Sequence, residues 1–200
     1  MTPDPTATLG SNVVIARDVT VSAGAVIGDD GVLLRRAYVG VDAVVGDGAI
    51  IGGRLEDAAA PGPAQVLARG LVVRRGVVAS GAQVGRRAAS RGEMREGSRL
   101  ATDAALGWRG KLGPLTQVVE RSVVRGTVGS QSKLGSDVST GAHSQIGHRV
   151  TVHDNVRIAR LARIGDGSVV GVGTGVGPRS MLGQRAQVGV DVRVRGGAVR

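Results

Sequence analysis

The residues from Gln145 to Val172, QIGHRVTVHDNVRIARLARIGDGSVVGV, repeat with a period of six. A large aliphatic residue stands at every sixth position, and a Val, Ala, Ser or Thr follows each one four positions later. A helix face repeats near 3.6 residues and a simple strand near 2, so neither produces a strict six. The large residues are Ile146, Val152, Ile158, Ile164 and Val170.

The same period extends over most of the 200 residues. It holds for eight hexads from Leu9, and in a shifted frame at Val66, Val72, Val78 and Val84. It then holds for twelve hexads from Val128. Two segments depart from it: 57–65, which contains Pro61 and Pro63, and 90–121. Internal self-similarity of this length is the signature of a repeat architecture.

One inward aliphatic residue per hexad, followed by a small one, indicates a short strand and then a corner. Three such strands close a triangular coil, and successive coils stack about 4.8 Å apart through parallel backbone hydrogen bonds. The composition fits a thin aliphatic interior, because the chain has 34 glycines, no phenylalanine, one tryptophan and one tyrosine.

Charge and composition restrict the function classes. Lysine and arginine exceed aspartate and glutamate by 26 to 16, but the basic residues are scattered and the aromatic platforms of single-strand nucleic-acid binders are missing. The absence of cysteine excludes disulfides and thiolate metal sites. The start of the sequence lacks the pattern of a signal peptide, and no apolar stretch is long enough to span a membrane. We therefore expect a cytoplasmic protein without a nucleic-acid partner.

Four segments carry a resemblance to a known family: QIGHRVTVHDN (Gln145–Asn155), VRG (Val124–Gly126), GWRGKLGP (Gly107–Pro114) and IGDGSVVGVGTGV (Ile164–Val176). They resemble the hexapeptide-repeat acyltransferases, and among these most closely UDP-3-O-acylglucosamine N-acyltransferase of lipid A biosynthesis. The family fold is the left-handed parallel β-helix. We therefore predict an all-β, left-handed parallel β-helix of one domain, 1–200, with regular coils at 9–56, 66–89 and 122–199. Residues 57–65 and 90–121 are expected to be loop insertions.

The resemblance also implies a reaction and its partners. An acyl group would pass from acyl carrier protein to the 2-amino group of a UDP-linked amino sugar, in a homotrimer that needs no cofactor and no metal. His148 would be the general base, since an imidazole titrates near neutral pH. Substrate-binding roles are implied for Trp108, Arg125, Gln145, Arg149 and Arg179, and an oxyanion role for the backbone N–H groups near Gly165 and Gly167.

Three departures from the family pattern keep other functions open. Val124 replaces an aspartate, Arg149 replaces an asparagine, and Arg179 replaces a second histidine. One alternative is a catalytically inactive β-helix that acts as a scaffold, and another is a coenzyme A-dependent sugar acetyltransferase. His143, His148 and His153 occupy different hexad positions, so we do not expect them to form a metal site.

Overall fold

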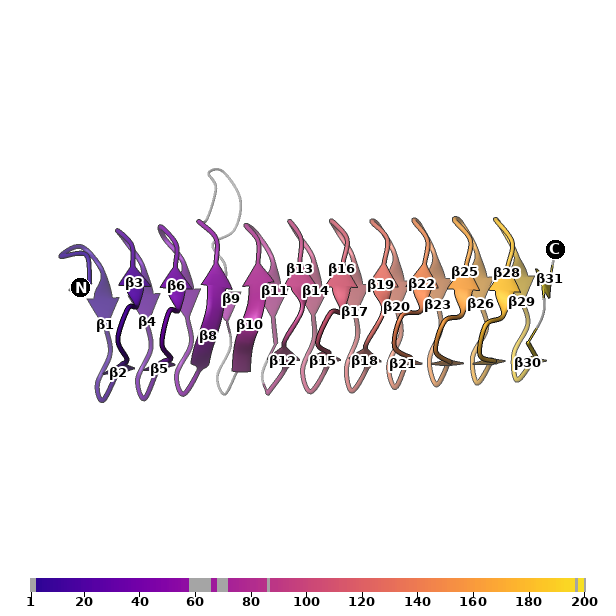
Figure 1. Ribbon diagram of the computed structural model, residues 1–200, viewed down its shortest axis with the longest axis horizontal. Coiled ribbons are helices and arrows are strands. Elements are labelled where there is room, and N and C mark those ends of the chain that lie inside the picture. Colours follow the sequence, from indigo (N-terminus) through magenta and orange to yellow (C-terminus); the bar gives the residue numbers. More distant parts are fainter. Residues whose placement is uncertain (1–2, 58–65, 68–71, 86, 197, 200) are drawn as a thin grey trace.

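The computed structural model describes residues 3–57, 66–67, 72–85, 87–196 and 198–199. These residues form a left-handed parallel β-helix in which short strands stack along one long axis, as the hexads and the family resemblance together predicted (Figure 1). The described residues contain strands and turns but no helix, and so no helix that could cross a membrane.

Three faces of parallel strands build the coil. The first face holds β1 (Thr8–Leu9), β4 (Val26–Ile27), β7 (Val44–Val45), β9 (Val66–Leu67), β11 (Gln83–Val84), β14 (Arg99–Leu100), β17 (Gln117–Val118), β20 (Lys133–Leu134), β23 (Thr151–Val152), β26 (Val169–Val170) and β29 (Gln187–Val188). The second face holds β2 (Val14–Ile15), β5 (Val32–Leu33), β12 (Ala89–Ser90), β15 (Ala105–Leu106), β18 (Val123–Val124), β21 (Ser139–Thr140), β24 (Arg157–Ile158), β27 (Gly175–Val176) and β30 (Arg193–Val194).

The third face holds β3 (Thr20–Val21), β6 (Tyr38–Val39), β13 (Glu93–Met94), β16 (Lys111–Leu112), β19 (Thr127–Val128), β22 (Gln145–Ile146), β25 (Arg163–Ile164), β28 (Met181–Leu182) and β31 (Ala198–Val199). Two longer strands, β8 (Ile50–Leu55) and β10 (Val72–Val78), run from the second face onto the third. We call the turns after the first, second and third faces the first, second and third corners.

The interior is the stack of aliphatic side chains that the hexads predicted. The second residue of a strand points inward, and register aligns it with its counterparts in the neighbouring coils, as Val128, Ile146 and Ile164 show. All three are buried. Their partners are eighteen residues apart, which is one coil of three hexads. Small residues such as Ala162 fill the corners and are also buried.

The prediction of an insertion at 90–121 is wrong, because β13 to β17 lie there as regular coils. Its inward residues are Met94, Leu100, Leu106, Leu112 and Val118, each buried. The frame was lost because the second corner shortens twice, with only two residues between Ser90 and Glu93 and two between Val124 and Thr127. Ser90, a buried hydroxyl at an inward position, further hides the repeat.

The predicted frame at 66–72 is also one residue off. Register pairs Leu67 with Val45, and Val73 with Ile51, so the frame of the neighbouring coils continues at Leu67 and Val73 and not at Val66 and Val72. Strand β10 then turns the second corner without a break, which restores the frame at Val78. The predicted insertion at 57–65 falls, apart from Asp57, outside the described residues.

Candidate functional site

The three histidines occupy three different corners around the coil. His143 lies in the second corner between β21 and β22, His148 in the third corner between β22 and β23, and His153 in the first corner before β24. All three are exposed. Within the described ranges, no group of three or more His, Cys, Asp or Glu residues could hold a metal ion. The three histidines are close in sequence because they lie in consecutive corners, and they do not form one cluster.

His148 contacts Ser130, which stands one coil earlier in the same corner. The Ser130 backbone N–H donates to His148 Nδ1 at 3.0 Å, and Ser130 Oγ lies 2.7 Å from the same nitrogen. The His148 backbone N–H donates in turn to Asp166 Oδ1, one coil later, at 2.9 Å. Because a backbone N–H can only donate, Nδ1 must be the unprotonated nitrogen, and the neutral imidazole carries its proton on Nε2.

Other corners use aspartate where His148 stands. Asp29 Oδ1 accepts from the backbone N–H of Ser11, and Asp154 Oδ1 accepts from that of Ser136, both at 2.7 Å and across eighteen residues. These side chains satisfy a backbone donor of the coil before. His148 therefore has a structural role that its aspartate counterparts share, in addition to any chemistry of its imidazole.

An open groove of about 800 Å³ runs over the third face and third corner beside His148. Its outward strand residues are Lys111, Thr127, Gln145, Arg163 and Met181, and its corner residues include Pro114, Ser130, His148, Asp166 and Gln184. Met181 is 48% exposed and gives one end of the groove an apolar surface.

The cations of the groove differ in their partners. Glu93 forms ion pairs with Lys111 at 3.1 Å and with Arg95 at 3.0 Å. The hydrogen bond from Lys111 lowers the pKa of Glu93 from its ordinary value, Arg95 adds to this, and partial burial opposes it. Arg163 has no ion pair among the residues that the structure describes. It is therefore the lining cation available to an anionic ligand.

The implied substrate residues are not all brought together. Gln145 and His148 line the groove, whereas Arg149 occupies the same corner without lining it. Trp108, Arg125 and Arg179 lie on the second corner, in three different coils. Trp108 is 67% exposed, and the Arg109 guanidinium stacks on its ring 4.5 Å from the centroid.

The backbone donors near Gly165 are already used at two of three positions. Gly165 N–H donates to Leu182 O, and Gly167 N–H donates to His148 O, both at 2.9 Å. Neither is free to bind an oxyanion. The intervening Asp166 N–H has no hydrogen bond within the described part of the chain, and Asp166 lines the groove.

Sequence reasoning missed Ser130, Asp166 and Arg163. The eighteen-residue pitch was the available signal, since Ser130 and Asp166 stand one pitch before and one pitch after His148. Arg163 is likewise one pitch after Gln145 and pairs with it in register.

No family model matches the chain, and no curated sequence matches it either. Solved structures with a similar backbone include UDP-N-acetylglucosamine acyltransferase of Francisella novicida (13% identity, TM-score 0.44, 96% of this chain) and that of Arabidopsis (10% identity, TM-score 0.45, 92% of this chain). A third is UDP-N-acetylglucosamine O-acyltransferase of Moraxella catarrhalis, at 14% identity and TM-score 0.35, over 100% of this chain and 67% of that one.

The chain spans 62% and 64% of the length of the first two of these proteins. At such identities and TM-scores, the likenesses carry no argument about activity, substrate or assembly. The family resemblance of the sequence and the geometry around His148 are the grounds on which a function is proposed.

Proposed function

We propose that the protein is an acyltransferase. It moves an acyl group from the thioester of acyl carrier protein to the 2-amino group of a UDP-linked amino sugar, with His148 as the general base. One observation carries the proposal: His148, in a segment that resembles the family's active-site motif, lies against a hydroxyl at the edge of an 800 Å³ groove. That groove combines a free cation with an exposed apolar residue.

The lining of the groove suits two different parts of such a reaction. Arg163 provides a guanidinium for phosphate oxygens, which its planar fork binds with two hydrogen bonds. Met181 is a flexible apolar side chain, suited to contact a hydrocarbon chain. An amine and a thioester held together there react as an almost intramolecular pair, which removes much of the entropic cost of their encounter.

The position of the imidazole proton determines the route of proton transfer. Nδ1 is the basic nitrogen, and Ser130 Oγ lies against it at 2.7 Å. As the amine attacks the thioester, its proton passes to Ser130 Oγ while the Ser130 proton passes to Nδ1. The imidazolium then returns a proton to the departing thiolate, so the ring ends neutral. Asp166 N–H, on the next coil, is the backbone donor that would stabilise the oxyanion in this scheme.

Assembly belongs to the same proposal. The groove is open along a flat parallel face, and a second copy packed on it would supply the missing wall. We infer a homotrimer that closes three such grooves. The formal net charge of +10 favours an acidic donor such as acyl carrier protein. The substrate roles of Gln145, Arg149, Arg125, Trp108 and Arg179 remain part of the proposal. A cytoplasmic location is part of the same proposal.

Two substitutions at His148 separate chemistry from structure. In His148→Asn the side-chain oxygen can still accept the Ser130 N–H but cannot take a proton, whereas His148→Ala loses both functions. We expect both to reduce the rate of acyl transfer by about 10²–10⁴-fold. Only His148→Ala should lower the free energy of unfolding, by about 1 kcal/mol.

The experiment is an acyl-transfer assay with acyl carrier protein and a UDP-linked amino sugar, alongside urea unfolding. Wild-type rates in His148→Asn would remove the imidazole from the mechanism.

A specific observation favours a second candidate, an inactive scaffold. His148 Nδ1 accepts a backbone N–H of the previous coil, as Asp29 and Asp154 do at their corners. That candidate predicts no transfer by the wild type with any donor.

A further inference from the structure

A second groove, of about 620 Å³, lies on the second face at its C-terminal end. It covers β21, β24, β27 and β30, which are separated from His148 by the second corner and the third face. Four arginines line it: Arg125, Arg157, Arg193 and Arg195. No acidic residue is among its lining residues.

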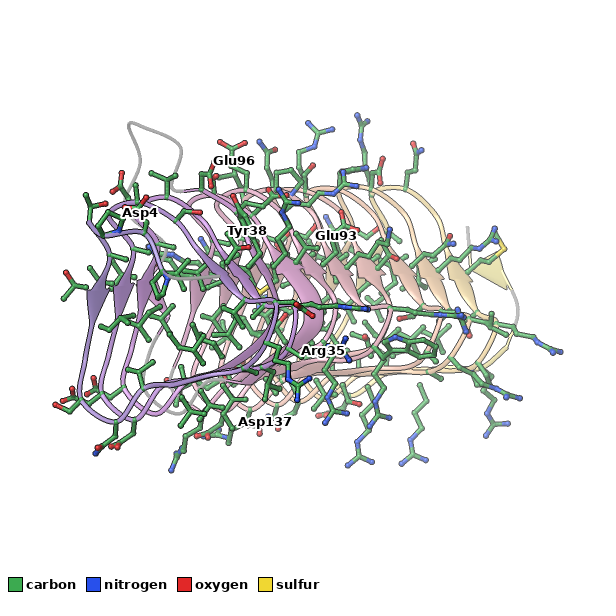
Figure 2. All side chains as sticks on the ribbon, turned by 60° about the vertical axis from the view of Figure 1, so that its left-hand side comes forward. Asp4, Arg35, Tyr38, Glu93, Glu96 and Asp137 are labelled. Atoms are coloured by element: carbon green, nitrogen blue, oxygen red, sulfur yellow. The ribbon has the colours of Figure 1, made fainter. Side chains whose placement is uncertain are left out.

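The four guanidinium groups have no ion pair within the described residues. Exposed arginines elsewhere in the chain do find acidic partners, as Arg121 does with Asp137 at 2.7 Å and Arg87 with Asp103 at 2.7 Å. The second groove is therefore a local excess of positive charge. Figure 2 shows nitrogen-tipped side chains projecting from the C-terminal half of the coil.

Register explains the shape of the groove. Arg157 pairs with Gly175, and Gly175 pairs with Arg193, so a bare backbone position stands between two outward arginines. Adjacent parallel strands are about 4.8 Å apart, which places the two arginine Cα atoms about 9.6 Å from each other. A Cβ built on Gly175 would find its nearest neighbour, Arg193 Cγ, 4.0 Å away. The space between the two arginines is open.

We propose that this groove binds the diphosphate group of a small molecule, with Arg157 and Arg193 on either side of it over Gly175. Guanidinium groups bind phosphate oxygens through paired, charge-assisted hydrogen bonds. A bare glycine lets an anion approach the backbone closely, which a side chain would prevent. Arg195, at the corner that follows Arg193, supplies further charge for the second phosphate. The site does not depend on the proposed acyl transfer, because it shares no lining residue with the groove at His148.

Calorimetric titration with inorganic pyrophosphate at constant ionic strength tests the proposal. Arg157→Gln and Arg193→Gln should each weaken binding about tenfold or more, because each removes charge-assisted hydrogen bonds. Gly175→Val should weaken it comparably by filling the space. Valine is tolerated at that position, since Val32 and Val123 occupy it in β5 and β18.

Two controls isolate the site. Arg185→Gln removes the same charge from another corner, where Gln131 already shows that glutamine fits the backbone, and should change the dissociation constant less than about twofold. His148→Ala should bind pyrophosphate as the wild type does. Uridine diphosphate titrated in parallel distinguishes a diphosphate ester from free diphosphate as the preferred source.

The results can overturn the proposal in two ways. Wild-type affinity in Gly175→Val would show that the space between the arginines is not the site. Equal losses in Arg185→Gln and Arg157→Gln would show a diffuse attraction of anions to a basic surface. An enzyme inactive in acyl transfer that still binds pyrophosphate through Arg157 and Arg193 would refute the proposed function and leave this inference standing.

Discussion

The N-terminal and C-terminal coils of this protein have the same aliphatic interior, but their outer surfaces have opposite net charge. Leu33 and Leu134 occupy equivalent inward positions, and both are 0% exposed. Outside, residues 1–60 contain eight acidic and four basic residues, whereas residues 126–200 contain four acidic and ten basic residues. The inward column specifies the coil, so the outward positions are free to vary in charge. The side chains that we assign to the candidate sites are accordingly those of outward and corner residues.

The corners show the same difference. One residue in most corners has a positive φ, and in the N-terminal coils it is mainly Asn, Asp or Gly, as at Asn12 (φ 56°) and Asp18 (φ 61°). These residues tolerate the left-handed region well. In the C-terminal coils Arg149, Leu161, Arg179 and Arg185 adopt it with φ between 55° and 60°. Asp137, Asn155 and Asp191 still follow the N-terminal pattern, so some of the C-terminal corners, but not all, hold a long side chain in this less favourable backbone conformation.

The largest expected effect tests whether the two interiors are equivalent. Leu33→Ala and Leu134→Ala should each lower the free energy of unfolding by about 2–5 kcal/mol, because each leaves a cavity in a closely packed column. Urea unfolding followed by circular dichroism measures both. A loss at one end that is several times the loss at the other would break the comparison.

The second effect concerns the corner acceptors. Asp29→Ala and Asp154→Ala should each cost about 1 kcal/mol, because each leaves a backbone N–H of the previous coil without its acceptor. The Asn variants keep an accepting oxygen and serve as controls that should stay close to the wild type. Unchanged unfolding of both Ala variants would mean that water replaces the carboxylate at no cost.

The third effect depends on pH. In the folded protein the pKa of Glu93 is lowered, mainly by Lys111. The ion pairs of Glu93 therefore stabilise the fold above its unfolded pKa of about 4.5, and this stabilisation is lost as the pH falls through the folded pKa. Wild type should exceed Glu93→Gln by less than about 1 kcal/mol at neutral pH, since the pairs are exposed. Urea unfolding at several pH values should show this difference closing below pH 4.5. A difference that persists in acid would have another origin.

The smallest effect tests the strained corners. Leu161 has φ 60° and Asn12 has φ 56°. Leu161→Asn should raise the free energy of unfolding by about 0.5–1 kcal/mol, because asparagine tolerates this conformation better than leucine. Asn12→Leu should lower it by a similar amount. Thermal unfolding of the two variants measures both, and a shared sign would contradict the explanation.

Much of the fold follows from the sequence alone, because the inward residues of 9–51 and 128–194 keep a strict period of six. Residues 90–121 were misread because two corners lose two residues each and Ser90 takes an inward position. A strict period of six residues is interrupted wherever a corner is shortened, although the strands on either side still stack in register.

The sites were harder to anticipate than the fold. The outward direction of His148 follows from its hexad position, but its bond to Ser130 depends on which residue of the previous coil lies beneath it. The arginine groove depends likewise on Arg157, Gly175 and Arg193 falling in one column. Such neighbours are separated by a whole coil, and the shortened corners change that separation from eighteen to sixteen residues in places.

The shortened corners also make the length of this chain unusually adaptable. Leu106 and Ser90 are register partners sixteen residues apart, whereas Leu112 and Met94 are partners at eighteen, and both pairs are joined by the same kind of parallel ladder. A deletion of two residues at the second corner therefore does not change the position of any later strand along the axis of the β-helix. A gene for such a coil can therefore lose or gain two codons at the second corner while the residues at the other two corners keep their positions.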